Sequence, residues 1–73
     1  MNEKDYQKAL NIMAVWQHEE HIARASNFRE AARYSDYYTA GLMMIELASG
    51  KPYEEIVRDV TFVYIKTYEV SHD

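Results

Sequence analysis

Residues 40–52 read Ala-Gly-Leu-Met-Met-Ile-Glu-Leu-Ala-Ser-Gly-Lys-Pro, and this stretch decides the fold. Its first nine residues contain one charged side chain, that of Glu46, and helix-breaking residues follow directly. Gly50 suits the left-handed residue that ends a helix, and Pro52 suits the first turn of the next helix. We therefore expect one helix to end near residue 49 and another to begin near residue 53.

A second, softer boundary lies at residues 26–27. Asn27 can cap a new helix, and Glu30 stands three residues later, where a capping box would place it. The two boundaries predict three helices, over about 4–25, 28–49 and 53–69, within one domain that spans residues 1–73. Apolar residues recur at helical spacing in the first and third of these segments. The members of that pattern are Tyr6, Leu10, Met13 and Trp16 in the first, and Ile56, Val60, Val63 and Thr67 in the third.

The sequence thus predicts an all-α, three-helix domain whose first two helices form an αα-hairpin. Residues 61–70 are rich in β-branched and aromatic residues, so a strand is the rival interpretation there. We prefer a helix because the chain contains no second strand that could pair with it.

Composition and charge exclude several classes of function. The chain has 73 residues, a net charge of −4 and no cysteine, so neither disulfides nor thiolate-bound zinc can brace it. No basic stripe exists, and we therefore expect no direct binding to nucleic acids. The N-terminus is polar and the longest apolar run is far too short to span a bilayer, so we expect a cytoplasmic protein with no membrane attachment.

The segment 28–49 has two contrasting halves. One stripe at helical spacing forms an ordinary core face, and we expect Phe28, at its start, to be buried near Ile22 or Ala25. The other members of this stripe are Ala31, Ser35, Tyr38, Leu42 and Ile45. In the second half, Met43, Met44 and Leu47 point away from the core stripe. A helix that is apolar on all sides is usually buried on all sides, and two other helices cannot cover it completely.

A second stripe beside the core face is our candidate binding site, and its members are Tyr34, Tyr37, Gly41, Met44 and Ala48. Tyrosine and methionine are enriched at protein interfaces, and small residues such as Gly41 and Ala48 would let another helix approach. We expect this stripe to contact a protein partner, either a second copy in a homodimer or a larger target. The alternative is that these residues complete an intramolecular core, with the tyrosine hydroxyls reaching water.

Catalytic and metal-binding signals are weak. The segment His18-Glu19-Glu20-His21 places two imidazoles three residues apart, but a metal site needs three or four ligands and the third histidine is His72. The chain has no glycine-rich phosphate loop, no cysteine nucleophile and no motif around its serines. We therefore expect neither an enzyme nor a bound cofactor.

Residues 27–36 resemble the start of the second helix of the UVR motif, a helical hairpin of excision-repair subunits and of adaptors in bacterial protein-degradation machines. Five residues fit that pattern: Phe28, Glu30, Ala31, Ala32 and Asp36. Ser35 and Gly41 depart from it, since arginine and leucine are usual there. Tetratricopeptide hairpins use a similar corner. The resemblance implies a helical hairpin and a function in protein–protein interaction.

Small acidic chains without catalytic motifs are often regulators, including inhibitors encoded by phages and other mobile elements. This association favours an adaptor or a stoichiometric inhibitor. An acidic decoy that blocks the nucleic-acid site of a defence or replication complex is the first alternative. A small metal-binding protein is the second.

Overall fold

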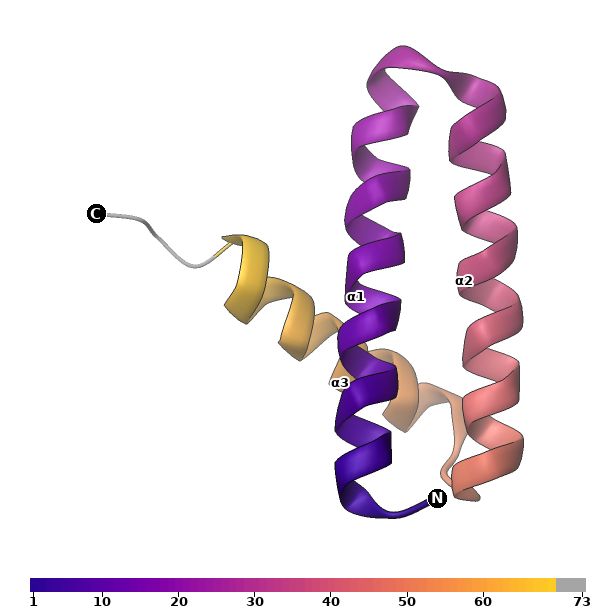
Figure 1. Cartoon of the computed structure of the whole chain (residues 1–73), viewed down its shortest axis with the longest axis vertical. Coiled ribbons are helices and arrows are strands. Elements are labelled where there is room, and N and C mark those ends of the chain that lie inside the picture. The colour runs from indigo at the N-terminus through magenta and orange to yellow at the C-terminus, as the bar shows by residue number, and fades with distance from the viewer. Residues whose placement is uncertain (70–73) are drawn as a thin grey trace.

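The computed structural model describes residues 1–69, and every element of secondary structure in that range is a helix. Helix α1 spans Glu3–Ser26, α2 spans Phe28–Ser49 and α3 spans Tyr53–Tyr64, and a short π-helix, η1, continues α3 over Ile65–Glu69. Helices α1 and α2 lie side by side and antiparallel, while α3 crosses one half of this hairpin at a steep angle (Figure 1). The prediction of an all-α, three-helix domain with an N-terminal hairpin is confirmed.

The strand alternative for the last segment is wrong over the residues that the structure describes. Residues 61–69 are helical, first as the end of α3 and then as η1. In η1 the ring of Tyr68 lies 3.9 Å from that of His18 on α1, with the two planes only 10° apart. This stacking ties η1 to α1 without a paired strand. Val70, which belonged to the same expectation, lies outside the described residues.

The helix boundaries follow from local capping. The side chain of Asn27 accepts a hydrogen bond from the backbone N–H of Glu30 at 3.2 Å, as an N-cap does. The reciprocal half of the capping box is absent at this corner, because the Asn27 N–H donates instead to the Ala23 carbonyl at 2.6 Å. Gly50 adopts a φ of 74° and donates to the Glu46 carbonyl at 3.0 Å, so the predicted left-handed end of α2 is confirmed.

The hydrophobic core lies where α3 crosses the hairpin. All three helices contribute to it, and its buried members are Tyr6, Leu10, Met13, Leu42, Ile45, Ile56 and Val60. Five partly buried residues pack around them: Ala9, Trp16, Tyr38, Val57 and Val63. Burying a large apolar side chain stabilises a fold by about 1.5–3 kcal/mol, so this cluster is the main source of stability.

Gly41 marks the closest approach of α2 to α1. A Cβ atom at this position would lie 2.5 Å from the Sδ atom of Met13 and 3.3 Å from the Cζ3 atom of Trp16. Neither distance leaves room for a side chain without displacing a packed neighbour. The helix that uses the space beside Gly41 is therefore α1 of the same chain.

The end of the hairpin beyond α3 is packed differently. Its buried residues are small, namely Ala23 and Ala31. The prediction that Phe28 is buried near Ile22 or Ala25 is wrong, because Phe28 is 81% exposed and both of those residues are exposed too. Side chains on a helix lean toward its N-terminus, so Phe28, the first residue of α2, leans past the end of the hairpin, where α1 has also ended.

Candidate protein-binding surface on the outer face of α2

The face of α2 that points away from the core is apolar over its C-terminal half. We call this surface the outer patch and define it by Tyr37, Ala40, Met43, Met44, Leu47 and Ala48. At 100° per residue, Ala40 and Leu47 lie opposite the buried stripe of Leu42 and Ile45. Leu47 is 87% exposed and Met44 is 69% exposed, although Leu42 and Ile45 on the opposite side of the same helix are buried.

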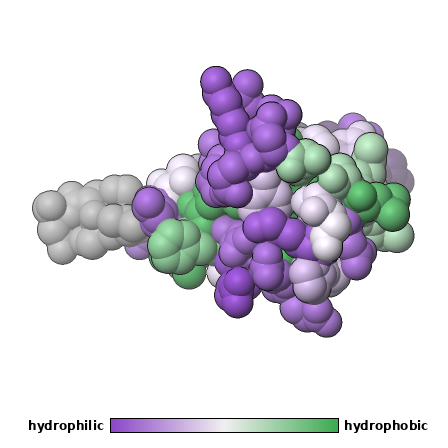
Figure 2. All heavy atoms as spheres, turned by 90° about the horizontal axis from the view of Figure 1, so that it is seen from below, coloured by the Kyte–Doolittle hydropathy of each residue, from purple (hydrophilic) through white to green (hydrophobic). Residues whose placement is uncertain are grey.

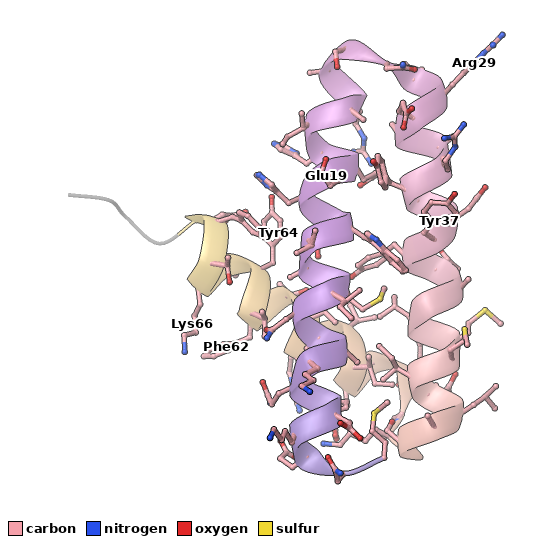
Figure 3. All side chains as sticks on the ribbon, in the orientation of Figure 1. Glu19, Arg29, Tyr37, Phe62, Tyr64 and Lys66 are labelled. Carbon is pink, nitrogen blue, oxygen red and sulfur yellow. The ribbon has the colours of Figure 1, made fainter. Side chains whose placement is uncertain are left out.

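Charged residues are absent from the outer patch. Glu46, the one charged residue of segment 40–48, falls between Leu42 and Met43 in the helical projection, on the flank of the patch. Along the same face toward the helix N-terminus, Arg29 and Arg33 replace the apolar side chains, and Arg29 extends into solvent (Figure 3). In the space-filling view, hydrophobic residues gather on the side of the molecule that α2 forms (Figure 2).

The five residues of the predicted site are divided by the fold. Tyr37, Met44 and Ala48 are exposed and belong to the outer patch, while Tyr34 is partly buried and Gly41 faces α1. The ring of Tyr37 leans toward the hairpin, with its centroid 5.7 Å from that of Trp16 and 6.2 Å from that of Tyr34. The predicted stripe therefore runs along the seam between α1 and the solvent.

Three residues of the outer patch were missing from the predicted site: Ala40, Met43 and Leu47. A signal for them was present, because positions 40, 43 and 47 follow the helical spacing of a second apolar face opposite the core stripe. The prediction placed the binding surface beside the core stripe. In the structure α1 packs against that flank of α2. The exposed apolar surface is therefore centred farther from the core stripe, on the opposite side of α2.

A groove of about 370 Å³ lies between α1 and α3. On its floor the Tyr6 hydroxyl donates to the Asp59 carboxylate at 2.6 Å, and the Lys51 ammonium lies 4.2 Å from the centroid of the Tyr6 ring. Burial, with the neighbouring Asp59 carboxylate, raises the pKa of Tyr6 well above its usual range. These groups satisfy one another, and their arrangement ties α1 to α3.

Other exposed apolar side chains are more dispersed. On α1, Ile12, Val15 and Ile22 share one face, but Glu19 lies between them (Figure 3). At the far end of α3, Phe62 is 64% exposed and lies 5.7 Å, centroid to Nζ, from Lys66. Neither group combines the continuity and the exposure of the outer patch.

The two histidines within residues 1–69 show no metal-site geometry, and His72 lies outside the described residues. His18 is held in its stack with Tyr68, and across residues 1–69 no three side chains of the metal-ligating types converge on one point. The metal-binding alternative therefore gains no support from the fold. Along the same residues, no helix has both the length and the apolar content needed to cross a membrane.

No protein-family model, no curated protein and no solved structure matches this chain.

Proposed function

We propose that this chain is a protein-binding module that acts as an adaptor or a stoichiometric inhibitor through the outer patch of α2, without catalysing a reaction. The observation that carries the proposal is the exposure of Leu47 and Met44 on a continuous apolar face whose opposite side already contributes fully to the core.

The size of the outer patch supports a binding role. Tyr37, Met43, Met44 and Leu47 together expose roughly 500 Å² of surface, which lies at the upper end for the largest apolar patch of a monomeric protein. At about 25 cal/mol per Å², covering such a patch contributes on the order of 10 kcal/mol before the entropic cost of association. That amount suffices for a specific complex once contacts around the rim are added.

The core does not require these residues. Leu42, Ile45, Ile56 and Val60 are at most 6% exposed, so the contact between α2 and the other helices is complete without the outer patch. Polar side chains would serve equally well on this face if it were only solvated. A binding role explains why they are absent.

The charged surface gives less support to the acidic-decoy alternative. Acidic and basic side chains are paired on the surface, as Glu20 is with Arg24 on α1 and as Lys51, just before α3, is with Glu55. A nucleic-acid mimic needs a dense field of one sign. Binding through the outer patch should therefore be nearly independent of salt, whereas binding by a decoy should weaken steeply as salt is added.

The test is quantitative affinity purification from cells of the source organism with three baits: wild type, Leu47→Asp and Thr39→Asp. Both variants add one carboxylate at an exposed position of α2, but only Leu47 lies in the outer patch. Because a buried, unpaired carboxylate is costly, Leu47→Asp should retain at least about tenfold less partner, while Thr39→Asp should match wild type. Equal recovery by all three folded baits would refute the proposal.

A further inference from the structure

We propose that the outer patch is covered by a second copy of the chain, with the two α2 helices packed antiparallel about a two-fold axis that passes between Met43 and Met44. This inference rests on the proposed binding role of the patch and names its partner. It is carried by the shape of the patch, by the charges beside it and by its area.

The shape of the patch is self-complementary in one orientation. Leu47, which is 87% exposed, projects as a knob, and Ala40 offers the matching small site on the same line of the helix. The two residues are seven positions apart, which corresponds to about 10 Å along the helix. A two-fold axis midway between them places each Leu47 over the Ala40 of the other copy, and such an isologous contact closes on itself.

A parallel pair would fit poorly. It would set Leu47 against Leu47 and leave a gap between the two Ala40 residues, although close packing requires large residues opposite small ones. In the antiparallel pair, Met43 and Met44 lie on either side of the axis, where their flexible side chains can fill the remaining space. The antiparallel register therefore uses all four central residues of the patch.

The charges along α2 favour the same orientation. The last turn of α2 contains no basic residue, and the Met1 ammonium, which donates to the Ala48 carbonyl at 3.3 Å, is the positive charge that lies at its negative dipole end. In the antiparallel pair Arg33 lies about 8 Å beyond the end of the partner helix along its axis, within reach of a long side chain. A parallel pair would instead place Arg33 beside Arg33.

The area of the patch approaches what a dimer requires. A standard interface buries about 800 Å² per partner. The four large side chains supply more than half of this, and the exposed Ala40 and Ala48 add to it. The N-terminus borders the patch, because the Met1 ammonium donates to the carbonyl oxygen of Ala48 at 3.3 Å.

The absence of cysteine makes the geometry directly testable. We would prepare Ala40→Cys, Leu47→Cys and, as a control on the flank of α2 beside Glu46, Thr39→Cys, and oxidise each protein alone and in pairs. A disulfide needs Cα atoms about 4.4–6.8 Å apart, so the mixed 40–47 disulfide should exceed either homodisulfide by roughly tenfold. The Thr39→Cys protein should stay largely uncrosslinked.

Sedimentation equilibrium on the cysteine-free protein provides the second measurement. Wild type and Thr39→Asp should show the mass of two chains at high concentration, and Leu47→Asp should show the mass of one. Circular dichroism would establish that the helices of each variant are intact.

Two outcomes would overturn the inference. Predominant 40–40 and 47–47 homodisulfides would show a parallel pair, and a wild type that stays monomeric with no crosslink above the control would exclude a second copy. If the monomeric wild type binds a target protein and Leu47→Asp abolishes that binding, the proposed function stands and only the inferred second copy is refuted. If Leu47→Asp also leaves target binding unchanged, both proposals fall.

Discussion

The two halves of the hairpin differ in the size of the side chains that are buried between the helices. In the half crossed by α3, large side chains such as Leu10, Met13 and Leu42 are at most 2% exposed. In the distal half, which lies beyond α3, the helices meet through Ala23 and Ala31. The outer surface of α2 differs in the same places, because it carries methionine and leucine over the core and arginine and aspartate near the turn.

This contrast shows that the apolar surface is not a consequence of weak packing. If exposed apolar residues compensated for a poor core, they would be found in the distal half, where only alanines are buried. They lie instead over the part of the molecule with the fullest core. The outer patch therefore adds apolar surface beyond what the fold needs, and the distal half should open first when the protein unfolds locally.

The largest effect should come from the core under α3. Leu42→Ala removes a side chain that is 1% exposed, and the resulting cavity should lower the free energy of unfolding by about 2–5 kcal/mol. Urea unfolding followed by circular dichroism measures this change. A loss below about 1 kcal/mol would mean that the two halves do not differ in packing as described.

The close approach at Gly41 should give the next largest effect. Gly41→Leu forces a side chain into the space of Met13 and Trp16, and overpacking of this kind costs about 1–3 kcal/mol. Ala32→Leu, at an exposed position in the distal half, is the matched control and should change stability by less than about 0.5 kcal/mol. Equal stabilities of the two variants would contradict the assigned packing of α1 against Gly41.

The link between α1 and α3 should show a smaller effect with a distinctive pH dependence. Tyr6→Phe removes the hydrogen bond to Asp59, which costs about 1–2 kcal/mol. Because the pKa of Tyr6 is raised in the folded state, its contribution is fully present below the usual tyrosine pKa of about 10 and is lost as the pH rises above that value. The free energies of unfolding of wild type and Tyr6→Phe should therefore differ at neutral pH and approach each other as the pH becomes strongly alkaline. A difference that does not change with pH would contradict this assignment.

The smallest effect belongs to the distal corner. Phe28→Ala should lower stability by less than about 1 kcal/mol, because the ring is 81% exposed. Thermal unfolding of the variant measures this directly. A loss of about 3 kcal/mol or more would show that Phe28 is buried in solution, as the sequence pattern first indicated.

The sequence predicts the helices well because their boundaries depend on local chemistry. Asn27 caps α2 and Gly50 ends it within the residues nearest to them, so no knowledge of the tertiary fold is needed. Spacing also identifies Leu10, Leu42 and most of the core. It cannot assign the flanks of α2, since that depends on which side α1 occupies.

The errors at Phe28 and Gly41 have one origin. Phe28 fits the core stripe by spacing, but its place at the first position of α2 leaves no neighbouring turn of α1 to cover it. Gly41 suggested room for a partner helix, yet α1 fills that room. The burial of Phe28 and the contacts of Gly41 both depend on where two helices end or cross. Helical periodicity carries no information about these positions.

The most direct test of the central claim is site-specific photocrosslinking in cells of the source organism. A photoreactive amino acid would replace Leu47 in one strain and Thr39 in another, because both positions are exposed on α2 but only the first lies in the outer patch. The account predicts a strong crosslink to another protein chain, either a second copy or a target, from position 47 and little from position 39. A protein that is folded and expressed at its normal level, yet yields no more crosslinked product from position 47 than from position 39, would contradict it.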